Sequence, residues 1–499
     1  MRRIFTAGQV RDAEDVLLAR TPEGALMRRA AHGLALEAVR MLRRRTGAVT
    51  GRRVTLLVGA GNNGGDALWA GFELRRRGVR VDAVLLVPDR AHPAGLAAFR
   101  RAGGRVSTHD GEDLVRDADL VVDGIVGISG QGALRPPAAA LVDAARNTPI
   151  LAVDLPSGVD PDTGAADGPA VTATATVTFG ALKPVHALAP HRCGPVTLVD
   201  LGLGPHLAEP YLQVLDDADV GAPWPVPGPA DDKYTQGVLG VAAGSATYPG
   251  AAVLATGAAV LATSGMVRFA GSAADVVRGR WPEVVAAGSV ADTGRTQAWT
   301  VGPGLGTGGT GRDILAAVLE RAVPTCLDAD AITLLAGGTV QAADLRDAVA
   351  EVPAVLTPHA GEFARLFGEV GPDRVAAARR AARQAGCTVL LKGHTTVIAD
   401  PDGRTCVHPS SGSWAATAGS GDVLSGLVGA LLAAGLEPWW AAAGAAHVHG
   451  LAAGLAAGAT AGRPGIPVGA SALLRAVPDA IRQVRTLLRE VRDSPTRGA

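Results

Sequence analysis

The chain has 499 residues, a length that predicts about two or three domains. Its 47 basic and 47 acidic residues give a formal net charge of +0, which argues against nucleic acid or a membrane surface as the main partner. The two most apolar stretches, 251–267 and 427–447, are weakly hydrophobic or interrupted by Glu437-Pro438, so neither resembles a membrane span. Aromatic residues make up only 3%, so the cores must be packed mainly with alanine, valine and leucine.

The cysteines and the start of the chain bear on the compartment. Cys193, Cys326, Cys387 and Cys406 are scattered, with no C-x-x-C pair and no histidine at metal-ligand spacing. Such cysteines are typical of reduced, structural residues in a reducing compartment. The basic start of the chain is not followed by an apolar run, so the sequence predicts no signal peptide. We therefore expect a cytoplasmic protein.

Lysine is unusually rare in this chain. Arginine occupies nearly every basic position, and the lysines that remain are Lys183, Lys233 and Lys392. A lysine ammonium is a compact point charge, whereas the arginine guanidinium is a rigid planar fork. A lysine kept against this bias suggests a position that needs the smaller charge. The plainer interpretation of Lys392 is a side chain that reaches solvent from a strand end.

In the first half of the chain, strand and helix patterns alternate. Residues 8–45 carry apolar positions at helical spacing and predict two amphipathic helices. Residues 53–58 predict a strand, and a glycine-rich turn at 59–66 leads into a helix, an order typical of a nucleotide-binding α/β unit. Further strands are expected at 79–87, 120–123 and 150–154. The pattern predicts a Rossmann-like three-layer αβα domain.

Three polar, glycine-rich segments follow these predicted strands. They are GAGNNGGD at 59–66, DGIVGISGQGA at 123–133 and DLPSG at 154–158. In an open parallel sheet, ligands bind beyond the carboxyl ends of the strands, so we expect the three segments to converge on one site. The first segment does not match the G-x-G-x-x-G dinucleotide fingerprint.

Oxygen-bearing side chains in these segments offer a cation site. Asn63, Asp123 and Ser157 supply amide, carboxylate and hydroxyl oxygens, which are ligands that hard cations prefer. Each aspartate taken alone is equally well explained as a helix cap or a turn former. The occurrence of three such segments in one domain favours a functional site.

These motifs, with T-F-G-x-x-K-P at 178–184, resemble the NAD(P)H-hydrate epimerase domain, and the resemblance covers residues 1–215. It implies a potassium ion held by Asn63, Asp123 and Ser157. We expect Asp154 to be the acid/base group, with Lys183 as a second candidate. The chain departs from the family at Ala67, where a third glycine is usual, and at Ile128-Ser129. The substrate contacts that the resemblance implies are Asn62, Asn63, Gly64, Gly65, Asp66, Gly127, Ile128, Ser129, Gly130, Gln131, Gly132, Ala133 and Asp154.

A short segment separates the two halves of the chain. Residues 216–232, DDADVGAPWPVPGPADD, are rich in proline and aspartate and have no hydrophobic period. Such a composition is typical of an extended linker or a surface arm. We therefore expect a second domain to begin at residue 233.

Strands and helices alternate again over residues 233–490. Runs rich in β-formers lie near residues 237, 300, 325, 355 and 388, and each runs into a glycine loop or a helix. The alternation predicts a second three-layer αβα domain with a mostly parallel sheet, helices on both faces and a site at the strand ends.

The segment Ala418–Asp422, AGSGD, precedes an apolar run of helical length. A glycine-rich loop that opens a helix directs free N–H groups and the positive end of the helix dipole at a phosphate. The Asp422 carboxylate beside such a site suits a base that takes a proton from a hydroxyl group, or a ligand that holds a metal. The alternative is an ordinary turn with Asp422 as helix cap. No G-x-x-x-x-G-K-[ST] occurs, so the chain is not a P-loop enzyme.

The motifs SATYPGA, GPGLG, DADA, TPHxGE, LKGxxT and AGSGD resemble the ribokinase-like superfamily and, within it, the ADP-dependent NAD(P)H-hydrate dehydratases, over residues 233–480. The resemblance implies ADP as co-substrate and a magnesium ion at its phosphates. Trp414 departs from the family pattern, and we expect it to pack in the core. The implied nucleotide-binding residues are Lys392, Gly393, His394, Thr395, Thr396, Gly419, Ser420 and Gly421, and the implied hydrate-binding residues are Ala252, Gly304, His359 and Asp422.

The two resemblances agree on one substrate, hydrated NAD(P)H. They imply that the first domain epimerises the R and S forms at C6 and that the second dehydrates the S form with ADP, releasing NAD(P)H, AMP and phosphate. We expect these small-molecule partners, a homo-oligomer, and neither nucleic acid nor membrane. Two rivals stay open: a ribokinase-like vitamin or sugar kinase that releases a stable phosphoester, and a non-enzymatic nucleotide sensor. A pure binder has no need of a carboxylate beside a phosphate.

Overall fold

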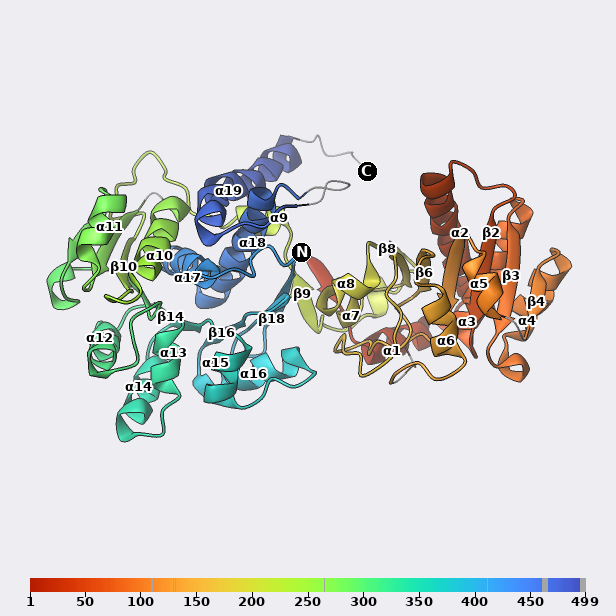
Figure 1. Ribbon diagram of the computed structural model, residues 1–499, viewed down its shortest axis with the longest axis horizontal. Helices are drawn as coiled ribbons and strands as arrows, with labels where there is room; N and C mark the ends of the chain where they lie inside the picture. The colour runs from red at the N-terminus through yellow and green to blue at the C-terminus, as the bar shows by residue number, and fades with distance from the viewer. Residues whose placement is uncertain are drawn as a thin grey trace. The chain divides into compact units, whose positions relative to one another are not determined.

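The computed structural model describes residues 1–108, 111–128, 130, 132–263, 265–410, 412–459 and 465–493. The chain divides into two compact units (Figure 1). One comprises Arg3–Leu212, and the other comprises Gln213 onward together with Met1–Arg2. Among the described residues, no helix is long and apolar enough to cross a bilayer. The predicted α/β class is confirmed for both halves of the chain.

The N-terminal unit is built on a seven-stranded parallel sheet with the order β4-β3-β2-β5-β6-β7-β8. The central strands are continuous apolar runs because both faces of the sheet are covered. Strands β4 and β8, at the two edges, are half-exposed and carry no clear sequence signal. The strands are β2 (Arg53–Val58), β3 (Arg80–Leu85), β4 (Arg105–Ser107), β5 (Leu120–Gly124), β6 (Ile150–Val153), β7 (Ala175–Phe179) and β8 (Val196–Val199).

Helices cover both faces of this sheet, and neighbouring strand residues alternate between two cores. Val54 and Leu56 of β2 pack with the first four helices, whereas Leu57 packs with the next two. The predicted pair of amphipathic helices is present as α1 (Ala7–Leu18) and α2 (Ala25–Thr46). The remaining helices are α3 (Asn62–Arg76), α4 (Pro93–Arg101), α5 (Gly111–Arg116), α6 (Ala138–Ala144), α7 (Pro184–Leu188) and α8 (Pro190–Cys193).

The second sheet has eleven strands in the order β1-β9-β18-β17-β16-β15-β14-β13-β10-β11-β12, and β10 to β18 belong entirely to the C-terminal unit. It is parallel from β16 to β12, and β17 is antiparallel to both of its neighbours, so the expected mostly parallel sheet is confirmed. The strands are β1 (Arg2–Ile4), β9 (Leu212–Val214), β10 (Val238–Ala242), β11 (Met266–Ala270), β12 (Val285–Ala287), β13 (Ala298–Val301), β14 (Thr325–Leu327), β15 (Ala354–Leu356), β16 (Thr388–Leu391), β17 (Thr395–Ala399) and β18 (Thr405–Pro409).

Two groups of helices cover this sheet. Figure 1 shows α10 (Pro249–Ala262), α17 (Ser420–Ala433), α18 (Pro438–Ala457) and α19 (Ala470–Asp493) together on one face. Helix α17 lies inside this layer and is buried from Val423 onward, which explains why it is apolar all round. The other helices of the sheet are α11 (Ala274–Arg280), α12 (Gly309–Leu319), α13 (Asp330–Leu335), α14 (Val340–Ala350), α15 (Ala360–Phe367) and α16 (Arg374–Ala385).

The segment 216–232, predicted as an extended linker, is partly folded. Residues Asp217–Gly221 form helix α9, and Asp216 caps its first turn. Val220 is 1% exposed and Trp224 is 4% exposed, and both belong to the core of the C-terminal unit. This part of the segment is therefore anchored to that unit, because its two apolar side chains find a buried site that composition alone does not reveal.

Candidate functional site

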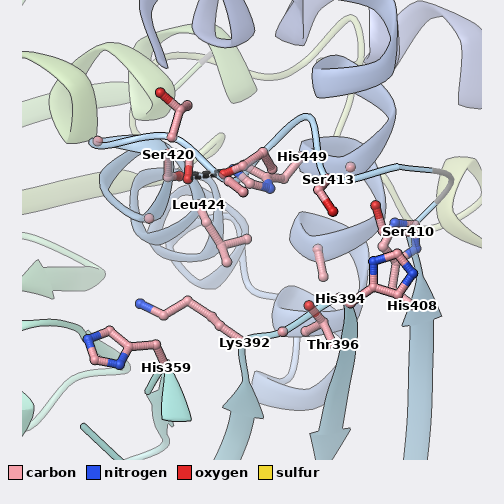
Figure 2. A pocket seen from close by; sticks show the side chains of 18 of the residues that line it. His359, Lys392, His394, Thr396, His408, Ser410, Ser413, Ser420, Leu424 and His449 are labelled. Carbon is pink, nitrogen blue, oxygen red and sulfur yellow. Dashed lines mark hydrogen bonds between the residues drawn. The ribbon is translucent and has the colours of Figure 1, made fainter. Parts of the chain in front are cut away.

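A pocket of about 670 Å³ opens at the carboxyl ends of β14 and β16, beside the start of α17. Figure 2 shows Lys392 and His359 on one side of it, His394, Thr396 and His408 on another, and Ser420 and His449 above them. The AGSGD segment, residues 418–422, lines the pocket together with residues 392–394. Parallel strands that end at one edge of a sheet place these segments together, as the sequence predicts.

An ion pair stands at the floor of the pocket. The Lys392 ammonium lies 2.7 Å from Asp328 Oδ1 and 3.8 Å from Glu362 Oε2. The Thr357 hydroxyl donates to Asp328 Oδ1 over 2.8 Å, so the carboxylate is held from two strands. Burial alone would lower the pKa of Lys392, but the carboxylates of Asp328 and Glu362 raise it above its usual value. The lysine therefore stays charged, and its side chain keeps 20% exposure toward the pocket.

The start of α17 presents unused backbone donors. Gly419 precedes the helix with φ of 84°, a left-handed conformation that glycine adopts at little cost. In the part of the chain that the structure describes, the N–H groups of Gly421 and Asp422 have no hydrogen-bond partner. A methyl group added at Gly421 would lie 3.5 Å from Lys392 Nζ. Two free N–H groups thus lie close to a lysine ammonium, an arrangement suited to an anion.

Asp422 is a partly buried carboxyl group at this helix start. Burial and the negative charge of Asp328 raise the pKa of Asp422, and the positive charge of Lys392 lowers it. The net result is a pKa of about 7. A carboxyl group with a pKa near neutrality exchanges protons readily at physiological pH. The geometry and the pKa together suit a general base.

The other residues expected at this site fall into two groups. His359 lines the pocket, and its Nδ1 accepts hydrogen bonds from the N–H groups of Gly361 and Glu362 as the N-cap of α15. Ala252 is fully buried against Gly244, and Gly304 contacts Tyr248. Trp414 packs against the core, as expected. The pocket lining includes neither Ala252, Gly304 nor Thr395, although it includes Gly393, His394, Thr396, Gly419 and Ser420.

In the N-terminal unit, two of the expected cation ligands meet at the ends of β5 and β6. Asp123 is fully buried, and its carboxylate accepts hydrogen bonds from the Ser157 hydroxyl over 2.7 Å and the Ser157 N–H over 2.9 Å. Burial raises the pKa of Asp123 to about 6. Among the described residues the buried amide nitrogen of Asn63 has no hydrogen-bond partner, and Asn63 Oδ1 faces Gly127. The oxygens of Asn63, Asp123 and Ser157 are ligands that hard cations prefer.

Asp154 and Lys183 form a second buried pair in this unit. The Lys183 ammonium lies 2.5 Å from Asp154 Oδ1, 2.9 Å from the Thr178 hydroxyl and 3.1 Å from the Phe179 carbonyl. Its side chain is 1% exposed. The ammonium has three N–H donors and all are engaged, so Lys183 is suited to holding the Asp154 carboxylate rather than to abstracting a proton.

The backbone of Asp154 is itself strained. Its φ is +68°, which is rare for a residue with a side chain. His186 supports this conformation: its Nδ1 accepts from the Lys183 N–H over 3.0 Å, and its Nε2 lies 2.9 Å from the Asp154 carbonyl. Since a carbonyl only accepts, Nε2 carries the proton. Burial lowers the pKa of His186 to about 4, so the ring is neutral.

The expected substrate loops lie around this pair. Asn62 begins α3, and Asp66 in its second turn is buried, which raises its pKa well above the usual range. Gly64 faces the Gly59 carbonyl and Gly65 faces His92, so neither position has room for a side chain. Ile128 packs in a small apolar cluster, Gly130 closes a turn on Gly127, and Gly132 and Ala133 follow in the loop. Ser129 and Gln131 lie outside the described residues.

The departure at Ala67 has a structural partner. Ala67 is fully buried, and a methyl group added at Gly124 would lie 2.6 Å from the Ala67 methyl. The glycine at the end of β5 therefore makes room for the extra methyl group on α3. The Ala67 methyl group is therefore accommodated by packing against Gly124.

Thr178 opens the T-F-G-x-x-K-P motif, but sequence analysis assigned no role to it, to His186 or to His449, although each contacts an expected site residue. Their sequence separations from those residues range from three to about thirty positions. A histidine three residues after a lysine that follows a strand is a weak local signal, and His449 carries none.

The fold and the two sites define a class of protein. A Rossmann-like parallel unit is followed by a ribokinase-like unit. The GSGD helix start, the lysine and the carboxylates of the second unit are typical of sites for nucleotide phosphate chemistry. Comparison with family models agrees: residues 23–185 match the YjeF-related protein N-terminus, and residues 239–467 match NAD(P)H-hydrate dehydratase.

The chain belongs to the family of bifunctional NAD(P)H-hydrate repair enzymes, which joins an epimerase domain to a dehydratase domain. It is 56% identical over 484 residues to the repair enzyme Nnr of Mycobacterium leprae (96% of this chain, 99% of the relative) and 38% identical to that of Corynebacterium glutamicum (97% and 99%). Among solved structures, the Bacillus subtilis ADP/ATP-dependent NAD(P)H-hydrate dehydratase is 26% identical over 55% of this chain and 99% of that chain, with a TM-score of 0.48.

Removing one member of the buried Asp154–Lys183 pair tests its importance for folding. Lys183→Met leaves a buried carboxylate without its cation and should lower the free energy of unfolding by about 3–5 kcal/mol. Adding Asp154→Asn in the same chain should restore part of that loss, because an amide is cheaper to bury than an unpaired carboxylate. Urea unfolding of wild type and of the single and double variants measures both effects. Strictly additive losses would contradict the pairing.

Proposed function

We propose that the C-terminal unit uses ADP to dehydrate the S epimer of hydrated NAD(P)H, written NAD(P)HX. Asp422 is the proposed general base of this reaction. One observation carries the proposal: a carboxyl group whose pKa is about 7, two free backbone N–H groups and a lysine ammonium line the same pocket. The N–H groups suit the phosphoryl group, and the carboxylate suits the hydroxyl group that receives it. Preorganised donors of this kind contribute about 3–4 kcal/mol each to transition-state stabilisation.

The proposed reaction balances in three steps. Asp422 takes the proton of the C6 hydroxyl as that oxygen attacks the terminal phosphorus of ADP, and AMP leaves. The lone pair of the ring nitrogen then expels phosphate by breaking the C6–O bond. Loss of a proton from C5 restores the ring double bond and gives NAD(P)H. Lys392 and the N–H groups of Gly421 and Asp422 stabilise the charge on the phosphoryl oxygens.

A magnesium ion belongs with this chemistry. Magnesium usually binds through phosphate oxygens and water, with one or two protein carboxylates. Asp328, which lines the pocket, and Glu362, whose carboxylate lies 3.8 Å from Lys392 Nζ, are the residues we propose to hold it. When bound, it neutralises charge on the transferring phosphate. Among the described residues, no three acidic, histidine or cysteine side chains are grouped so that they could hold a metal ion by themselves.

For the N-terminal unit we propose that Asp154 is the acid/base group of epimerisation and that Asn63, Asp123 and Ser157 hold a potassium ion. Asp154 is fixed by Lys183 and His186, so its carboxylate is preorganised. The ion supplies positive charge close to the substrate loops. We also propose that the protein is cytoplasmic and that it forms a homo-oligomer. The support for the location and for the oligomeric state is the family resemblance.

The role of Asp422 is tested by Asp422→Asn. The amide cannot take a proton, so dehydration of pure S epimer should fall by about 10²- to 10⁴-fold, while ADP binding stays nearly intact. In wild type, kcat/KM should rise with pH up to about 7 and level off above it, because only the ionised form of Asp422 is a base. Stopped assays of NADH formation across pH measure both. Wild-type rates in Asp422→Asn would refute the assignment.

The role of Asp154 is tested separately. Asp154→Asn should abolish conversion of the R epimer to the S epimer, because the amide neither accepts nor donates the required proton. Dehydration of pure S epimer by the same variant should match wild type and serves as the internal control. Chromatography of the two epimers over time gives the epimerisation rate. Epimerisation at the wild-type rate would show that another group performs the proton transfer.

A further inference from the structure

His449 lines the pocket beside the AGSGD segment and contacts the backbone of that segment. The residue is on α18, is 8% exposed, and its Nε2 is 2.9 Å from the Ser420 carbonyl oxygen (Figure 2). The Ser420 hydroxyl donates to the Ala415 carbonyl over 2.6 Å. The first residue of α17 is therefore held at both its side chain and its carbonyl.

The hydrogen-bond chemistry fixes the protonation of this ring. A carbonyl oxygen only accepts, so His449 Nε2 must carry a hydrogen. Burial lowers the pKa of His449 to about 4, so the ring is neutral near pH 7 and Nδ1 is unprotonated. The ring is then a single, directed N–H donor aimed at one peptide group.

That peptide group is the one that supplies the free N–H of Gly421. A peptide unit is planar and trans, so its C=O and its N–H point in opposite directions. Anchoring the Ser420 carbonyl to α18 therefore helps to fix the direction of the Gly421 N–H, and Lys392 Nζ lies 3.5 Å from where a Gly421 side chain would begin. A hydrogen bond to the carbonyl also polarises the peptide and strengthens its N–H as a donor.

We propose that His449 is a positioning residue for phosphoryl transfer, which acts by orienting the Gly421 N–H at the terminal phosphate of ADP. This inference rests on the proposed dehydratase function. His449 lies outside the sequence motifs, whereas the Gly421 N–H that it would orient lies within the AGSGD motif. We assign His449 no proton transfer, because its ring N–H is committed to Ser420 and its low pKa makes the free Nδ1 a poor base at neutral pH.

The chain supplies a matched control on the same helix. His447 is 9% exposed, about as buried as His449, and its Nε2 contacts Asp217 Oδ1 at 2.7 Å instead of the loop. It does not line the pocket. His447→Leu therefore removes a comparable buried histidine and its hydrogen bond without touching Ser420.

The experiment compares His449→Leu, His449→Gln and His447→Leu with wild type. Leucine removes the donor, whereas glutamine keeps an N–H group at similar reach. For His449→Leu, kcat for dehydration of the S epimer should fall about 10- to 100-fold, below the full effect of losing an anion-hole donor. His449→Gln should recover most of that loss, and His447→Leu should stay near wild type.

Nucleotide affinity gives a readout that does not depend on the reaction. AMP lacks the terminal phosphate, so titration calorimetry should show its Kd unchanged in His449→Leu while the Kd for ADP rises about tenfold. Equal weakening of AMP and ADP would show that His449 contacts the nucleotide directly and would overturn the inference, as would wild-type kcat in His449→Leu. If leucine prevents folding, His449→Asn, whose amide is too short to reach Ser420, replaces it.

Failure of the proposed function would look different. If wild-type protein forms no NADH from the S epimer and ADP, the dehydratase assignment fails, but the ratio of ADP to AMP affinity still reports whether His449 orients the Gly421 N–H. If wild type is active and His449→Leu matches it in both kcat and that ratio, only the positioning role is wrong.

Discussion

The chemistry of the C-terminal unit depends on one ion pair, Lys392 with Asp328. Asp328 follows β14 and Lys392 follows β16, and Thr357, which follows the intervening strand β15, donates a hydrogen bond to the Asp328 carboxylate. The pair keeps a positive charge at the pocket floor where a phosphate must bind. It also places a negative charge close enough to Asp422 to raise its pKa further than burial alone would. A single contact thus supports both the anion site and the base.

The N-terminal unit uses the same combination for a different purpose. Lys183 also pairs with an aspartate at a strand end, but its three N–H donors are consumed by Asp154, Thr178 and the Phe179 carbonyl. Lys392 is instead open to its pocket. Two of the three lysines in an arginine-rich chain therefore occupy buried pairs, where a compact ammonium fits and a planar guanidinium would not.

Much of this architecture is predictable from local pattern. Strand, glycine turn and helix recur with clear spacing, and parallel topology alone brings AGSGD and Lys392 together. Local sequence pattern does not predict which distant residues a side chain contacts. His186 and His449 act through backbone carbonyls on distant segments. The edge strands β4 and β8 are too exposed to show a hydrophobic period. Trp224 is buried only because the C-terminal core leaves a site for it. These features depend on tertiary contacts.

The central claim is that one chain repairs both epimers of hydrated nicotinamide nucleotide, and one measurement tests it most directly. Purified protein is mixed with racemic NADHX, ADP, magnesium and potassium, and absorbance at the reduced-nicotinamide band is followed to completion. The account predicts complete recovery of NADH from both epimers. Recovery that stops near half, with the R epimer left over, would contradict the epimerase assignment, and no recovery with a stable phosphoester formed instead would contradict the whole account.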